Sequence, residues 1–139
     1  MGFFIKIVVY YSCDYRGEGM TTLLVVDDAL FMRETVKAIA SEGGFEIVGE
    51  AENGQQAIEQ YRKLQPDLVT MDITMPVLSG LDATKAIVEE FPQARIIVIT
   101  ALGQQKLVIK ALENGAKDFL TKPFDREQFI STLRQISAY

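Results

Sequence analysis

Apolar and polar positions change their spacing in a regular order along the chain after residue 20. Short runs rich in Val, Ile and Leu predict strands at 22–26, 45–49, 68–71, 95–99 and 117–120. Between these runs, apolar residues recur three or four positions apart, which is the spacing of amphipathic helices. Strands that alternate with helices predict an α/β fold in which helices cover both faces of a parallel sheet.

The runs also predict where each strand lies in the sheet and where the helices end. Three strands are nearly continuous in apolar residues and belong in the centre, whereas 45–49 carries charge and fits an edge. Asn53, Ser79 and Asp125 can cap the helices that follow them, and Gly43 and Gly115 stand where a left-handed residue ends a helix. We expect three helical stripes to pack in the core: Met32, Val36 and Ile39; Ala57, Tyr61 and Leu64; Phe129, Leu133 and Ile136.

Composition limits the classes of function. The 139 residues suit one domain, and a net charge of −5 argues against a general nucleic-acid or anionic-membrane binder. Cys13 is the single cysteine, so an internal disulfide and a Cys/His zinc site are excluded, and a reducing cytoplasm fits. The chain has no histidine and therefore lacks the commonest general base. Chemistry must come from carboxylates, hydroxyls, lysine and metal.

Residues 1–19 differ from the rest, because an apolar, β-prone stretch is followed by a polar segment with glycines. Lys6 interrupts the apolar stretch and no small-residue cleavage site follows, which argues against a signal peptide. The stretch is also shorter than the roughly twenty apolar residues of a membrane span. We expect residues 1–19 to be an N-terminal extension, either non-native or an extra edge strand, and residues 20–139 to form the domain.

Polar residues stand at the ends of four predicted strands: Asp27 and Asp28, Asp72, Thr100 and Lys122. Parallel α/β sheets bring the carboxyl ends of their strands to one crevice. Three carboxylates, a hydroxyl and a lysine in that crevice would form a magnesium-dependent phosphate site around Asp72, whose carboxylate can attack phosphorus.

Each of these residues also has a plainer interpretation. Asp27 and Asp28 could merely cap the next helix, and Asp72 could be a turn residue. Thr100 suits a strand by β propensity alone, and a lysine such as Lys122 is commonly a solvated surface charge. Their order and spacing together are far more specific than any one of them.

With that order and spacing, the stretches 27–33, 70–76, 103–105 and 115–119 resemble the receiver domain of two-component response regulators over about residues 20–139. Within that family, the stretches look like those of stand-alone chemotaxis members of the non-enteric kind. The resemblance implies a flavodoxin-like, doubly wound sheet of five parallel strands in the order 2-1-3-4-5.

The resemblance also implies the chemistry of the site. Asp72 would accept a phosphoryl group from a phosphohistidine on a CheA-type histidine kinase. Asp28 and Asp72 would bind Mg²⁺ directly together with the main-chain carbonyl of Thr74, and Asp27 would act through a bound water. Thr100 would hold a phosphoryl oxygen, as would Lys122.

A conformational switch is implied as well. Thr100 would move toward the phosphate and Phe119 would rotate into the space left behind, which changes the face made by the last two helices and the last strand. Phe119 stands where the best-known members have tyrosine, and it could instead be a plain core residue. Thr74 and Leu102 occupy positions that, in this family, modulate loss of the phosphoryl group. Their identities differ from the polar pair that the enteric member of the family has at these positions.

The implied protein is a cytoplasmic signalling switch, with catalysis limited to its own phosphorylation and dephosphorylation. Its expected partners are the CheA-type kinase, a flagellar switch protein such as FliM or an archaeal adaptor, and a phosphatase; neither nucleic acid nor membrane is expected. Three alternatives remain: a receiver outside chemotaxis, an FMN binder and an Asp-nucleophile phosphatase. FMN would favour hydroxyls and glycines where Asp27 and Asp28 stand, and the phosphatases carry a second Asp where this chain has Thr74.

Overall fold

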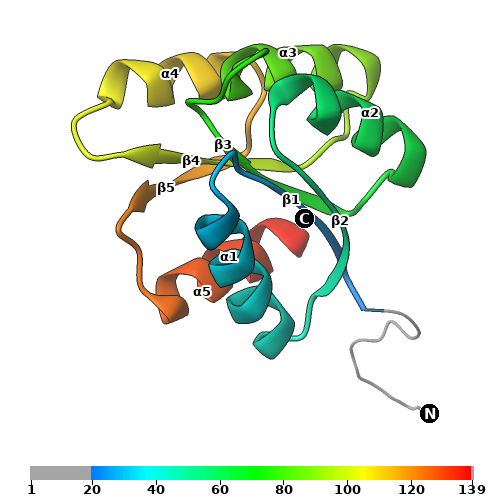
Figure 1. The fold of residues 1–139 in the computed structure, drawn as a ribbon, viewed down its shortest axis with the longest axis vertical. Helices are drawn as coiled ribbons and strands as arrows, with labels where there is room; N and C mark the ends of the chain where they lie inside the picture. The colour runs from blue at the N-terminus through cyan, green and yellow to red at the C-terminus, as the bar shows by residue number, and fades with distance from the viewer. Residues whose placement is uncertain (1–19, 139) are drawn as a thin grey trace.

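Five parallel strands form one sheet in the computed structural model, which describes residues 20–138 (Figure 1). The strands are β1 Thr22–Val26, β2 Glu46–Ala51, β3 Leu68–Asp72, β4 Ile96–Ala101 and β5 Asp118–Lys122. Their spatial order is β2-β1-β3-β4-β5, and every neighbouring pair is parallel. The predicted α/β fold and the implied strand order 2-1-3-4-5 are both confirmed. The expectation for residues 1–19 falls outside the described residues.

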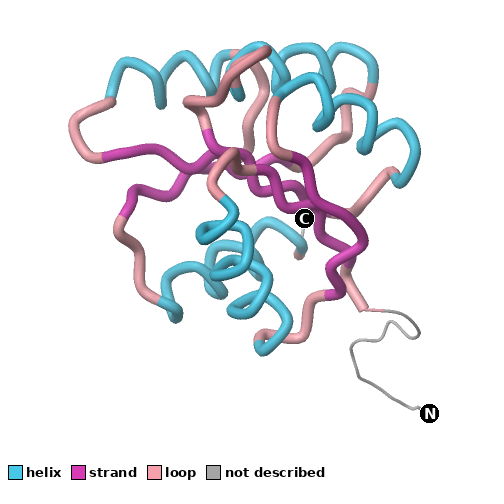
Figure 2. The backbone as a smooth tube through the Cα atoms, viewed as in Figure 1, coloured by secondary structure: helices cyan, strands magenta, loops and turns pink. Residues whose placement is uncertain are grey.

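Helices cover both faces of the sheet (Figures 1 and 2). They are α1 Leu30–Glu42, α2 Gly54–Leu64, α3 Gly80–Glu90, α4 Gln105–Glu113 and α5 Arg126–Ser137. Helices α1 and α5 lie together on one face, and α2, α3 and α4 form the layer on the other. This arrangement leaves the strand ends as the place where loops from both layers meet.

Alternate residues of the central strands divide the core into two halves. Leu24 and Val69 belong to a cluster with apolar residues of α2, α3 and α4, whereas Leu23 and Leu68 pack with those of α1 and α5. A strand buried on both faces needs apolar residues at nearly every position, which explains the continuous runs. The predicted helical stripes lie in these clusters or pack against them. The charged strand β2 lies at the edge, as predicted.

The three predicted N-caps are confirmed. The side chains of Asn53, Ser79 and Asp125 each accept a hydrogen bond from the backbone N–H three residues later, at the starts of α2, α3 and α5. Such a bond satisfies one of the backbone donors that the first helical turn leaves without a partner.

The predicted helix-ending glycines need one correction. Gly115 has a φ of +110° and follows α4, as expected, but Gly43 has a φ of −80° at the C-cap of α1. The left-handed residue is Gly44, with a φ of +95°. Helix α1 therefore continues in right-handed backbone one residue further than the sequence indicates, and the turn into β2 is made by the second glycine.

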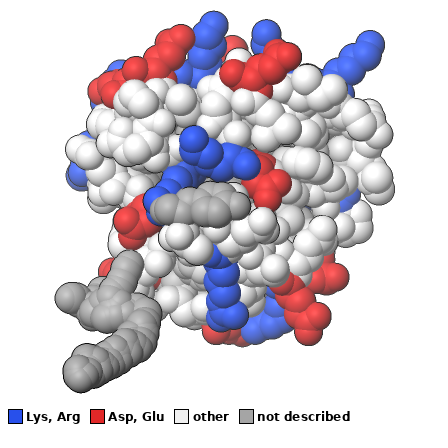
Figure 3. All heavy atoms as spheres, turned by 180° about the vertical axis from the view of Figure 1, so that it is seen from behind, with Lys and Arg blue, Asp and Glu red and all other residues white. Residues whose placement is uncertain are grey.

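The surface carries both signs of charge. Figure 3 shows Lys and Arg side chains interspersed with Asp and Glu over the face opposite the view of Figure 1. Within residues 20–138, none of the helices combines the length and the apolar character that a membrane crossing requires.

Candidate functional site

The ends of four strands bring the candidate residues to one edge of the sheet. Asp27 directly follows β1, Asp72 is the last residue of β3, and Lys122 is the last residue of β5. Thr100 is the residue before the end of β4, because this strand continues to Ala101. The sequence prediction that these residues share one edge is confirmed, with Thr100 one residue inside its strand.

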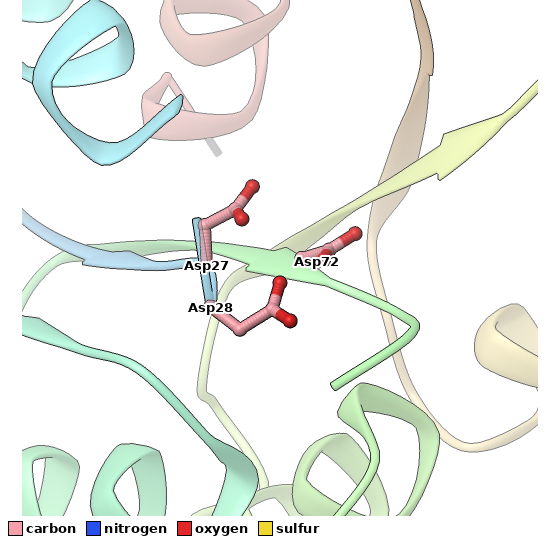
Figure 4. A group of neighbouring side chains, drawn as sticks. All are labelled: Asp27, Asp28 and Asp72. Carbon is pink, nitrogen blue, oxygen red and sulfur yellow. The ribbon is translucent and has the colours of Figure 1, made fainter. Parts of the chain in front are cut away.

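Three carboxylates gather at the neighbouring ends of β1 and β3 (Figure 4). Asp27, Asp28 and Asp72 each offer one carboxylate oxygen, and these oxygens all lie within 4.8 Å of one another. Asp27 and Asp72 are buried, with 2% and 7% of their surface exposed, whereas Asp28 is exposed. Buried like charges at this separation repel one another, so the cluster needs positive charge nearby.

Lys122 contributes part of that charge. Its Nζ lies 3.4 Å from Asp27 Oδ2 and 3.5 Å from Asp72 Oδ1. The pKa of Asp72 is raised to about 6, chiefly because the carboxyl is buried and secondly because of the charge of Asp27, while Lys122 opposes the rise. One lysine against three carboxylates leaves the site rich in negative charge, and oxygen ligands in such a cluster suit a hard divalent cation.

The backbone of Asp27 is fixed by a cation that sequence reasoning missed. The Arg33 guanidinium donates to the Asp27 carbonyl oxygen at 2.8 Å, and its Nε pairs with Glu50 Oε1 at 2.9 Å. The Asp27 carboxylate accepts from the Ala29 N–H at 2.9 Å. Arg33 therefore links the first loop of the site to β2. The signal in the sequence that could have pointed to this role is the position of Arg33, one turn into α1.

Two glycines allow the loop after β3 to pack tightly. The Gly80 N–H donates to the Ile73 carbonyl at 2.8 Å, and a Cβ on Gly80 would lie 2.1 Å from the Asp72 carbonyl oxygen. The Gly54 N–H donates to the Leu78 carbonyl at 2.8 Å, where a Cβ would lie 2.3 Å away. Only glycine permits backbones to approach this closely. The starts of α2 and α3 thereby hold the loop that carries Asp72.

The buried Thr100 hydroxyl has a partner that sequence reasoning did not anticipate. It donates to Gln104 Oε1 at 2.7 Å. A hollow of about 340 Å³ lies beside it and is also lined by Phe119. Phe119 is 41% exposed, which excludes the alternative of a plain core residue. Thr74 is exposed in the loop after β3, and its main-chain role stays a prediction.

Comparison with known proteins places this arrangement in a family. Residues 23–134 match the model of the response regulator receiver domain. The chemotaxis protein CheY of Thermotoga maritima is 50% identical over 115 residues, which cover 83% of this chain and 96% of the relative. CheY of Bacillus subtilis is 51% identical over 113 residues, or 81% of this chain and 94% of the relative.

A solved structure agrees with these sequence relatives. The crystal structure of a CheX–CheY–BeF₃–Mg²⁺ complex from Borrelia burgdorferi has a TM-score of 0.79 and 36% identity, over 83% of this chain and 87% of that chain. The matched region runs from the first strand into the fifth helix, and the chain therefore belongs to the response regulator receiver domain family.

Proposed function

We propose that this chain is a phospho-accepting response regulator of a chemotaxis system, in which Asp72 receives a phosphoryl group from a phosphohistidine of a CheA-type kinase. The observation that carries the proposal is the setting of Asp72. Its buried carboxylate ends a central strand, 3.5 Å from the Lys122 ammonium and beside two further carboxylates. Identity near one half to CheY proteins over most of the chain supports the chemotaxis assignment.

The chain acts as a signalling switch, and the proposed chemistry is confined to its own phosphorylation. An oxygen of the Asp72 carboxylate attacks phosphorus while the P–N bond to the donor histidine breaks. The histidine nitrogen keeps the electron pair of that bond, and Asp72 becomes an acyl phosphate. Lys122 Nζ is near enough to Asp72 to donate a charge-assisted hydrogen bond to an oxygen of the transferred group.

The donor set of the crevice fits Mg²⁺, which prefers oxygen ligands. Asp28 and Asp72 would hold the ion directly with the Thr74 main-chain carbonyl, and Asp27 would do so through a water, as the family pattern implies. When bound, the ion offsets negative charge on the phosphoryl oxygens during transfer. The clustering of three carboxylate oxygens within 4.8 Å supports this assignment.

Magnesium is expected to raise the melting temperature of the protein. Binding to the folded state alone stabilises it by about 2.7 kcal/mol at a concentration one hundred times Kd. An Asp28→Ala variant should be more stable than wild type without magnesium, because one repelling charge is gone, and should lose the response to the ion. Thermal unfolding followed by circular dichroism, with and without millimolar MgCl₂, measures both effects.

A matched control removes an aspartate elsewhere. Asp118 begins β5, at the opposite end of that strand from Lys122. The Asp118→Asn variant should keep the full magnesium response. An Asp28→Ala protein that gains as much as wild type from magnesium would show that Asp28 is not a ligand.

The proposed switch uses Thr100 and Phe119. Both residues line the hollow of about 340 Å³, which offers space into which the Phe119 ring can rotate once Thr100 moves toward the phosphoryl group. Such a rotation would change the face formed by α4, β5 and α5. Three apolar residues are exposed in α4 or in the loop that precedes it: Leu102, Ile109 and Leu112. Apolar residues exposed in this way suit the docking of a protein partner.

The proposed partners are the kinase, a phosphatase, and either a flagellar switch protein such as FliM or an archaeal adaptor. Affinity capture on immobilised protein, with and without beryllofluoride as a phosphoryl mimic, tests this function. We expect the flagellar switch protein or the archaeal adaptor to be retained only on the beryllofluoride-loaded chain. The Asp72→Asn variant should retain neither. Equal capture in both states would contradict a phosphorylation-dependent switch.

A further inference from the structure

Gln104 joins the proposed phosphoryl site to the start of α4. Its Oε1 accepts from the Thr100 hydroxyl at 2.7 Å and from the Ala101 backbone N–H at 3.3 Å. Thr100 is 2% exposed, so this short bond is largely shielded from water. Gln104 itself is the N-cap residue of α4, where it forms no side-chain cap hydrogen bond within the described part of the chain.

The two contacts fix the direction of the Thr100 bond. A backbone N–H can only donate, so the Gln104 atom that faces Ala101 must be the amide oxygen and not the nitrogen. The same oxygen faces Thr100, whose hydroxyl is therefore the donor. A hydroxyl has one proton to donate. The Gln104 oxygen at 2.7 Å is a much nearer acceptor than the Ala101 carbonyl at 3.5 Å, so the proton is directed at Gln104 and cannot also be donated to a phosphoryl oxygen.

We propose that Gln104 is a positioning residue that holds Thr100 in the unphosphorylated arrangement and thereby sets the threshold of the switch. The inference rests on the proposed function, because it requires Thr100 to turn toward a phosphoryl group bound at Asp72. Gln104 and the phosphoryl oxygens compete for one hydroxyl proton. The protein loses the free energy of the Thr100–Gln104 bond when the switch turns on. This bond therefore shifts the conformational equilibrium away from the phosphorylated arrangement.

The same competition connects the site to the partner face. Once Thr100 leaves, the Gln104 side chain is free to accept from backbone N–H groups in the first turn of α4, which have no side-chain cap in the present arrangement. The Gln104 carbonyl already accepts from the Leu107 and Val108 N–H groups, so this residue is built into the first turn. Release of Gln104 would therefore change the start of the helix that borders the docking face.

Beryllofluoride binding tests the competition. A hydrogen bond of this kind contributes about 0.5–1.5 kcal/mol net to the arrangement that contains it. Removing it with Gln104→Ala should therefore tighten beryllofluoride binding about two- to tenfold at fixed Mg²⁺. The measurement is titration of wild type and variant by ¹⁹F NMR. Gln105→Ala removes the adjacent glutamine, which is exposed at the first position of α4, and should bind as wild type does.

A double-mutant cycle separates this role from a general effect on the loop. In a Thr100→Ala background there is no hydroxyl to compete for, so adding Gln104→Ala should leave the affinity unchanged. Equal affinity of wild type and Gln104→Ala would overturn the inference while leaving the proposed function standing. A gain that persists without the Thr100 hydroxyl would also overturn it. Wild-type protein that takes up no beryllofluoride would overturn both.

Discussion

Replacing Asp72 with asparagine is expected to abolish labelling of the protein by acetyl phosphate. The proposed nucleophile is a carboxylate oxygen, and the neutral amide of Asn can neither attack phosphorus in the same way nor form an acyl phosphate. The loss should be complete within detection, because no second carboxylate takes the position at the end of β3. Incubation with radiolabelled acetyl phosphate and Mg²⁺, followed by gel electrophoresis, measures the result.

The Asp72→Asn variant is also expected to change the stability of the folded protein. The pKa of Asp72 is raised from 3.8 to about 6. The folded state therefore binds the Asp72 proton more tightly than the unfolded chain, and stability falls as pH rises from about 4 through 6. Without Mg²⁺, Asp72→Asn should be more stable than wild type by about 1–3 kcal/mol at pH 7.5, and this difference should vanish near pH 4.

The control for both measurements is Asp118→Asn, which should be labelled as wild type is. Label that persists on Asp72→Asn would move the phosphoacceptor to another residue. A stability difference between Asp72→Asn and wild type that is the same at pH 4 and pH 7.5 would contradict the raised pKa.

Replacing Gly80 with alanine is expected to destabilise the fold by about 3 kcal/mol and to slow phosphorylation. The added Cβ would lie 2.1 Å from the Asp72 carbonyl oxygen and 2.9 Å from the Ile73 Cα. Both obstacles are backbone atoms, which cannot move aside as a side chain can, so the start of α3 or the end of β3 must shift. Urea denaturation gives the change in the free energy of unfolding, and acetyl phosphate labelling gives the rate.

Gly44→Ala is the comparison variant. Gly44 has a φ of +95°, and no neighbouring heavy atom lies within 4 Å of the position that a Cβ would take, so alanine there meets backbone strain without a clash. We expect a cost of about 1 kcal/mol and unchanged labelling, because the residue lies between α1 and β2. Gly80→Ala protein as stable as wild type would show that the loop after β3 is not held in this packing.

The periodicity of the sequence predicts much of this fold. The run at 22–26 coincides with β1, and composition alone predicts the edge position of the charged strand. The caps at Asn53 and Ser79 follow from local chemistry, since a short polar side chain bonds the backbone of its own helix. The strand order had no such local signal and came from the family resemblance.

The features that sequence reasoning missed depend on contacts across the fold. Strand β4 continues through Thr100 to Ala101, which pairs with Lys122 in β5, and no residue in the run itself marks that end. Arg33 reaches the Asp27 carbonyl because α1 packs beside β2, where Glu50 meets it. The Thr100–Gln104 bond is close in sequence, yet it depends on the turn between β4 and α4. The prediction of Gly43 as the left-handed residue was wrong, because Gly44 takes the positive φ in the turn into β2.

The identity of the phosphorylated residue tests the central claim most directly. Borohydride reduces an aspartyl phosphate to homoserine, which marks the modified position permanently for peptide sequencing by mass spectrometry. After incubation with acetyl phosphate and Mg²⁺, we expect homoserine at position 72, and none when Mg²⁺ is withheld. Homoserine at position 27 or 28, with position 72 unchanged, would contradict the assignment of Asp72 as the phosphoacceptor.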